Sequence, residues 1–89
     1  MHLLPPEFLI QTANVMGVGA AKYGPWNFRD TPVNLSTYLG AMMRHLTAIA
    51  DGEDIDESGF PHAAHIAASV AIILDAGKHG KLIDDRPKL

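Results

Sequence analysis

The 89-residue sequence contains no cysteine. This absence excludes disulfide bonds, thiolate nucleophiles and cysteine-type zinc sites, and it favours a reducing cytosol. We expect no signal peptide, because the N-terminal MHLLPPEF has no basic region. A membrane span is not expected either, since the run of apolar or small residues from Ile66 to Leu74 is about half of the roughly 20 residues that a bilayer requires. The sequence therefore predicts a cytoplasmic protein without a membrane partner.

Positive charge is also scarce, since seven Lys and Arg stand against ten Asp and Glu and leave a net charge of −3. General nucleic-acid binders neutralise phosphates with Lys and Arg, so the composition argues against that class but not against binding of one nucleotide. The length corresponds to a single domain over residues 1–89. Such a small domain buries only about two-thirds of its unfolded surface, which makes a homo-oligomer an expectation.

Strand signals are missing, because no segment alternates apolar and polar residues over five positions or more. Apolar residues recur instead with a helical period in three segments, residues 9–23, 35–49 and 63–74. Asn34 is the candidate N-cap of the second segment, and Gly52 lies just past its end. Residues 24–33 are expected to be irregular, and the tail after Gly80 is expected to be frayed. The sequence predicts an all-α protein, a compact bundle of three main helices.

An acidic turn joins the second and third predicted helices. Glu53, Asp54, Asp56 and Glu57 lie within five residues, and a hard cation such as Mg²⁺ or Ca²⁺ would relieve their mutual repulsion. The alternative is a solvated, charged loop without a metal. The segment also begins like an EF-hand loop, but the twelfth position is His65 where a bidentate Glu is needed, so a calcium hand is not expected.

Three histidines flank this turn. His62 and His65 share one face of the third helix with Ser69, and a short connection should bring His45 and Asp51 from the antiparallel second helix towards them. The sequence therefore predicts one polar site beside the acidic turn. The alternative is that His62 caps its helix and His65 is a hydrogen-bonded core histidine.

A further set of residues suits a nucleotide. Cationic side chains bind phosphate, while aromatic rings and an amide stack on a base or form hydrogen bonds with it. The candidates are Lys22, Tyr23, Trp26, Asn27, Arg29 and Arg44. The alternative is that the aromatic residues anchor the core and that the arginines pair with the acidic turn.

Three stretches of the chain carry a family resemblance: LLPPEFL, GAAKYG with WNF, and RHLTAIADGEDIDESGFPHAAH. Together they resemble the N-terminal domain of dATP/dGTP diphosphohydrolases, a family found mainly in bacteriophages and similar in role to the all-α MazG-like nucleotide pyrophosphohydrolases. The resemblance runs from about Leu3 to Asp75. It implies hydrolysis of dATP or dGTP to the monophosphate and pyrophosphate, with Mg²⁺, in the cytoplasm of an infected host cell.

The resemblance and the residue types together suggest roles for the candidate side chains. Lys22, Arg29 and Arg44 would bind phosphate oxygens, and Trp26 and Asn27 would contact the base. Glu53 or Asp56 would accept the proton of the attacking water. The candidate ligands for Mg²⁺, with Mn²⁺ or another divalent ion as the alternative, are Glu53, Asp54, Asp56, His45, His62 and His65.

Two other functions stay open at this point. One is a histidine-metal phosphohydrolase built on His45, His62 and His65, which would favour a transition metal over Mg²⁺. The other is a non-catalytic helical interaction module of a phage, in which the polar residues only fix the register of an oligomer.

Residues 63–74 carry apolar or small side chains on almost every face of the predicted helix. A lone domain of three helices cannot cover all of these faces, and soluble monomers avoid large exposed apolar patches. We therefore expect the protein to self-associate. Light scattering at micromolar concentration should return a mass above the 9.6 kDa of one chain, and a single-chain mass would contradict the prediction.

Overall fold

A computed structural model describes residues 1–88 and contains four helices and two very short strands. The three predicted helices are confirmed, and each ends within a few residues of its predicted boundary. The elements in chain order are α1 (Pro6–Tyr23), α2 (Asn27–Asp30), β1 (Val33–Asn34), α3 (Leu35–Ala50), α4 (His62–Lys78) and β2 (Leu82–Ile83).

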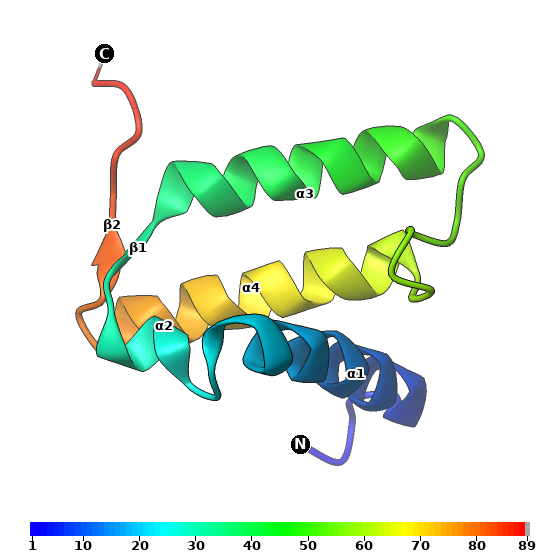
Figure 1. The fold of residues 1–89 in the computed structure, drawn as a ribbon, viewed down its shortest axis with the longest axis horizontal. Helices are drawn as coiled ribbons and strands as arrows, with labels where there is room; N and C mark the ends of the chain where they lie inside the picture. The colour runs from blue at the N-terminus through cyan, green and yellow to red at the C-terminus, as the bar shows by residue number, and fades with distance from the viewer. Residues whose placement is uncertain (89) are drawn as a thin grey trace.

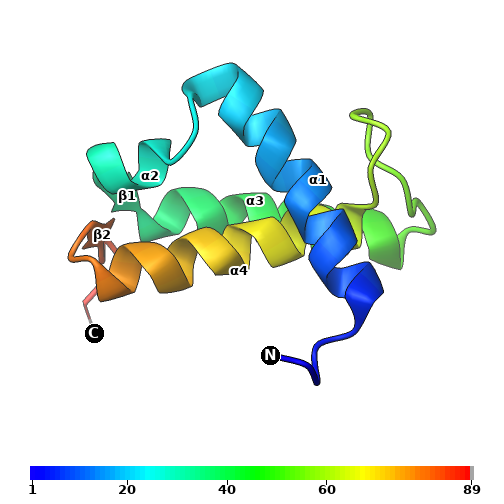
Figure 2. The same ribbon diagram turned by 90° about the horizontal axis from the view of Figure 1, so that it is seen from below.

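Helix α4 is the element on which the other two long helices pack. Helix α3 runs antiparallel along one side of α4, and α1 crosses α4 on another side (Figures 1 and 2). Helices α1 and α3 barely touch each other. The three helices are therefore not a closed bundle, because the space between α1 and α3 is not filled by direct contact between them.

The hydrophobic core is small and lies where α1 crosses α4. Val15 of α1 meets Ala64 and Ala68 of α4, with the half-buried Met16 and Phe60 against them. Alanines at a crossing let two helix axes come close, because the distance between axes depends on the side chains at the contact. Among residues 1–88 no large side chain is completely buried. Small residues thus hold the crossing together.

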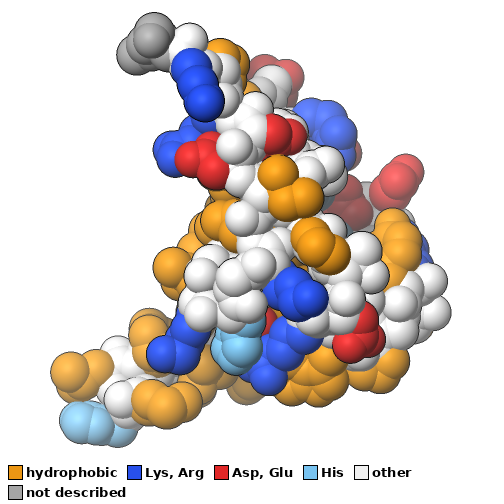
Figure 3. Space-filling view, turned by 90° about the vertical axis from the view of Figure 1, so that its left-hand side faces the viewer, with side chains coloured by type: hydrophobic (Ala, Val, Ile, Leu, Met, Phe, Trp, Pro, Cys, Tyr) orange, Lys and Arg blue, Asp and Glu red, His pale blue; other side chains and the backbone are white. Residues whose placement is uncertain are grey.

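Many large apolar side chains remain exposed on the single chain, among them Leu9, Leu46, Val70 and Leu74. Figure 3 shows such side chains spread over one face between Lys and Arg residues. The apolar stripe expected to face inward from residues 9–23 is only partly buried, because α1 contacts one neighbouring helix rather than two. None of the helices described within residues 1–88 is both long and apolar enough to cross a bilayer.

The expectations of no strands and of a frayed C-terminal tail are wrong. Val33 pairs in parallel with Leu82, and the Val33 N–H donates to the Lys81 carbonyl at 2.8 Å. The tail is also held by Asp85, whose carboxylate accepts hydrogen bonds from the backbone N–H of Ser36, at 2.8 Å, and from its hydroxyl. A strand of two residues is too short to show an alternating pattern of apolar and polar residues. The sequence pattern therefore could not predict this pairing between distant segments.

The start of α3 is capped from a distance. Asn34 occupies the predicted N-cap position, but its side chain makes no capping hydrogen bond. Asp85 supplies the acceptor instead, and an anion at a helix N-terminus also interacts favourably with the helix dipole. The C-terminal tail therefore contributes to the stability of α3 through Asp85.

Asp85→Ala should lower the midpoint of thermal unfolding by several degrees, because α3 loses its capping acceptor and the tail loses its anchor. Thermal unfolding followed by circular dichroism measures the effect. Asp84→Ala is the matched control, since it removes an equal charge from the neighbouring residue and only a local exposed pair with Arg86. Equal midpoints for the two variants would contradict the capping role.

Candidate functional site

The acidic turn is an ordered loop that folds back over the start of α4. Gly52 and Gly59 adopt φ angles of 94° and 87°, a region that glycine enters without the steric cost of a side chain. The Asp56 N–H donates to the Phe60 carbonyl, and the His62 N–H donates to the Asp54 carbonyl, both at 2.9 Å. These bonds bring the turn against the histidines of α3 and α4.

His62 lies at the centre of the site and is only 5% exposed. Its Nδ1 lies 2.7 Å from Nδ1 of His45, and its Nε2 lies 3.1 Å from Oε2 of Glu53. When the Nε2–H of a neutral His62 donates to the Glu53 carboxylate, its Nδ1 accepts a hydrogen bond from His45. Both ring nitrogens of the buried imidazole are therefore paired.

Asp56 and His65 form the second half of the cluster. The Asp56 carboxylate accepts the Ser58 N–H at 2.9 Å and lies 3.4 Å from Nε2 of His65, which is also 2.9 Å from the Ser58 hydroxyl. The hydrogen bond from the Ser58 backbone lowers the pKa of Asp56, so this carboxylate stays ionised at neutral pH. The His65 ring stacks on that of His45 with a centroid distance of 4.7 Å and an angle of 12°.

Three of these side chains have the arrangement of a metal site. One nitrogen each from His45 and His62 and one oxygen from Asp56 lie within 4.8 Å of one another. Burial, followed by the neighbouring His65 and His62, lowers the pKa of His45, and a neutral imidazole is the form that binds a metal. Glu53 accepts the hydrogen bond of His62 on the other side of its ring, as partners of ligand histidines commonly do. The donor set therefore fits a divalent ion.

Two carboxylates expected near the histidines, those of Asp54 and Asp51, lie away from this centre. Asp54 is exposed and contacts His62 through its backbone carbonyl rather than through its carboxylate. Asp51, expected to approach His62 and His65, is the exposed C-cap of α3, and Asp56 occupies the corresponding place. The reason is that the turn folds back after Gly52 and so carries its later residues inward.

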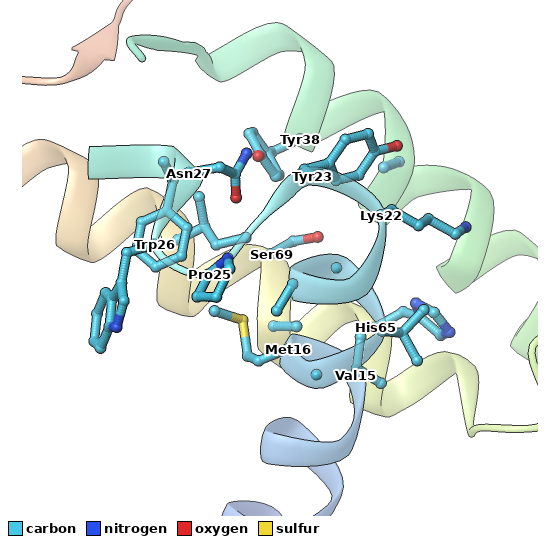
Figure 4. A pocket seen from close by; sticks show the side chains of 18 of the residues that line it. Val15, Met16, Lys22, Tyr23, Pro25, Trp26, Asn27, Tyr38, His65 and Ser69 are labelled. Carbon is cyan, nitrogen blue, oxygen red and sulfur yellow. The ribbon is translucent and has the colours of Figure 1, made fainter. Parts of the chain in front are cut away.

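A cavity of about 830 Å³ begins beside the histidines and extends between α1, α3 and α4. This volume lies within the roughly 300–1,000 Å³ range of small-molecule sites. Its walls are mainly apolar, and both His45 and His65 belong to its lining. Figure 4 shows His65 on one side of the cavity. The candidate metal centre and the cavity thus share His45, and His65 of the cavity wall lies beside Asp56 of the centre.

The predicted nucleotide-binding residues divide into two groups. Lys22, Tyr23, Trp26 and Asn27 all line the cavity, whereas Arg44 is exposed outside its lining. The Trp26 indole, however, extends away from the centre of the cavity (Figure 4).

Arg29 is engaged elsewhere rather than with phosphate or the acidic turn. Its guanidinium donates two hydrogen bonds to Asp75 of α4, at 2.7 and 3.0 Å, and lies 4.3 Å from the ring centroid of Trp26. Trp26 has a positive φ of 60°, a strained conformation for a bulky residue that these contacts help to hold. Arg29 therefore anchors α2 to α4.

The sequence did not predict Tyr38, Ser58 or Asp75 as residues of the site or its surroundings. Tyr38 lines the cavity, and burial, followed by the nearby Tyr23, raises the pKa of its hydroxyl. Its position could have been found, because it precedes His45 on the same helix face through Ala41 at spacings of three and four. No comparable signal links Asp75 to Arg29, since 46 residues separate them.

Arg29→Ala should lower the midpoint of thermal unfolding by several degrees, because α2 loses its attachment to α4. Arg44→Ala is the control, since that arginine is exposed and has no ion pair among residues 1–88.

The stabilising effect of Arg29 should also depend on pH. The Arg29 hydrogen bonds hold the pKa of Asp75 below its usual range. Their contribution to folding stability is therefore complete at neutral pH and is lost as acid protonates Asp75.

The difference in unfolding midpoint between the wild type and Arg29→Ala should therefore become smaller as the pH falls through the pKa of Asp75. Circular dichroism melts over an acid series measure this dependence. A difference that is absent at neutral pH, or that grows in acid, would contradict the anchoring role.

Comparison with known proteins identifies the family. The family model described as dATP/dGTP diphosphohydrolase, N-terminal, matches residues 1–86. A dATP/dGTP diphosphohydrolase of Salmonella phage PMBT28 is 31% identical over 87 residues, which cover 97% of this chain but 29% of that protein. No solved structure matches the chain. The family expected from the residue pattern is confirmed: this chain belongs to the family of dATP/dGTP diphosphohydrolase N-terminal domains.

Proposed function

We propose that this domain binds a deoxypurine nucleoside triphosphate and hydrolyses it, with a divalent metal, to the monophosphate and pyrophosphate. The observation that carries the proposal is the cluster of His45, Asp56 and His62, whose ligand atoms converge beside a large cavity. A ligand set next to a concave, mainly apolar pocket is the arrangement expected of a small-molecule enzyme site. The name of the phage relative supplies the substrate class.

The donor set bears on which metal is bound. Mg²⁺ prefers oxygen ligands, whereas two of the three groups here are imidazoles, which also suit Mn²⁺ and later transition metals. We therefore propose a divalent ion for which Mn²⁺ is the better fit and Mg²⁺ the alternative. When bound, such an ion lowers the pKa of a water and offsets charge on phosphate oxygens.

The contacts of the two carboxylates support a separate role for each in this proposal. The backbone hydrogen bond from Ser58 lowers the pKa of Asp56 and makes its carboxylate a weaker base, a property that suits a metal ligand better than a general base. Glu53 accepts the hydrogen bond of His62 Nε2, so it is a positioning residue that fixes which nitrogen of His62 faces His45. His65 lines the cavity beside Asp56, where it can face the phosphates.

A second candidate function is a histidine-metal phosphohydrolase. The observation that favours it is that three imidazoles, those of His45, His62 and His65, gather at one site. An enzyme of this kind would release triphosphate or inorganic phosphate instead of pyrophosphate. The products therefore distinguish the two candidates.

We also propose that the chain works as a homo-oligomer in the cytoplasm of a phage-infected cell, where free deoxynucleotides are available. The exposed Leu9, Leu46, Val70 and Leu74 support association, because contact between copies would remove large apolar side chains from water. The chain spans less than a third of the length of the phage relative that it matches.

The direct experiment incubates the protein with each dNTP in Mg²⁺, in Mn²⁺ and in EDTA, and identifies products by phosphorus NMR. Monophosphate with pyrophosphate from dATP or dGTP supports the first proposal. Triphosphate or orthophosphate alone supports the histidine-metal candidate. No turnover by folded protein would favour a non-catalytic module.

Asp56→Asn should lower turnover by about a hundredfold, because it keeps the shape of the side chain while removing a charge that the metal needs. Steady-state rates with dATP measure the change. Glu57→Gln is the matched control, since this exposed neighbour lies outside the ligand cluster and loses the same charge. Equal rates for the two variants would show that Asp56 does not take part.

A further inference from the structure

The cavity contains polar side chains that the protein itself does not pair. Ser69 of α4 is 9% exposed, and its side chain points into the cavity in Figure 4. Among residues 1–88, no side-chain hydrogen bond connects Ser69, Tyr38 or Asn27 to another residue. Buried His62, by contrast, has partners at both nitrogens. Polar groups that face a largely apolar pocket without a partner from the protein are available to a ligand.

The two ends of the cavity differ in chemistry. Figure 4 shows Lys22 and His65 on one side and Asn27 and Pro25 on the other, with Ser69 between them. The first end adjoins the His45–Asp56–His62 cluster and carries the cationic side chain. The second end offers an amide that both donates and accepts hydrogen bonds, beside apolar walls.

We infer that a deoxypurine nucleotide lies along this cavity with its phosphates at the Lys22–His65 end and its base at the Asn27–Tyr38 end. This inference rests on the proposed function, and it adds Tyr38 and Ser69 as residues that determine specificity. The Asn27 amide and the Tyr38 hydroxyl meet polar atoms of the base. The Ser69 hydroxyl lies between the ends and faces the sugar.

Charge distribution determines the direction of the nucleotide. Lys22 has no ion pair among residues 1–88, so its ammonium is available to phosphate. Arg29, the cation nearest to the other end by sequence, is neutralised by two hydrogen bonds to Asp75. The reverse direction would place phosphates beside the apolar ring of Pro25, where no free cation is present among residues 1–88 and anions are costly to bury.

The test measures equilibrium binding of two probes, 2′-deoxyadenosine and dATP, by calorimetry in EDTA, where metal-dependent hydrolysis cannot proceed. Asn27→Ala and Lys22→Ala probe the two ends. The matched controls are Asn14→Ala and Lys78→Ala, which remove the same side chains from exposed positions outside the cavity lining. Tyr38→Phe removes only a hydroxyl, and circular dichroism verifies that each variant is folded.

Asn27→Ala and Tyr38→Phe should each weaken binding of deoxyadenosine and of dATP by about fivefold, the effect of one lost neutral hydrogen bond. Lys22→Ala should weaken binding of dATP by about tenfold and change binding of deoxyadenosine by no more than about twofold, because only dATP carries phosphates. The two control variants should bind both probes as the wild type does.

Equal losses for both probes in Lys22→Ala, or unchanged deoxyadenosine binding in both Asn27→Ala and Tyr38→Phe, would overturn the inferred orientation. Failure of the folded wild type to bind either probe would also overturn it. If the variants bind the two probes as expected but the protein hydrolyses no dNTP with either metal, the proposed hydrolysis is overturned and the orientation is not. Turnover with unchanged deoxyadenosine binding in the Asn27 and Tyr38 variants would overturn the orientation alone.

Discussion

The burial of His62 at the first position of α4 is the constraint on which the site depends. A buried imidazole needs partners for both nitrogens, and here His45 of α3 and Glu53 of the turn provide them. Meeting both needs at once fixes α3, the turn and α4 relative to one another. Asp56 and His65 then lie beside the same ring system, so one satisfied histidine organises the candidate metal centre.

The way α1 packs produces the cavity. Because Val15 contacts small alanines of α4, the two helices meet closely at one crossing, and the C-terminal half of α1 then rises away from α4 (Figure 2). Arg29 and Asp75 hold the following α2 segment against α4, which keeps the far wall in place. The cavity therefore results from two features. Helices α1 and α4 meet closely at one crossing, around Val15, and the Arg29–Asp75 ion pair joins segments that are distant in the sequence.

Parts of the site were predictable because they follow local rules. Helical spacing placed His62, His65 and Ser69 on one face, and a short connection requires an antiparallel neighbour that carries His45. Which carboxylate would join them was not predictable in the same way. Asp51 and Asp56 have the same chemistry, and only the backward fold of the turn brings Asp56 inward.

The sequence by itself determined the helical segments, the family and the neighbourhood of the three histidines, because periodicity, motif order and loop length are properties of nearby residues. Only the tertiary structure decided the partners of Arg29 and the cap of α3 by Asp85. It also decided that the Trp26 indole extends away from the centre of the cavity and that Tyr38 is part of the cavity wall. These outcomes depend on contacts between segments tens of residues apart, where the free energy of the whole fold selects among side chains of similar local preference.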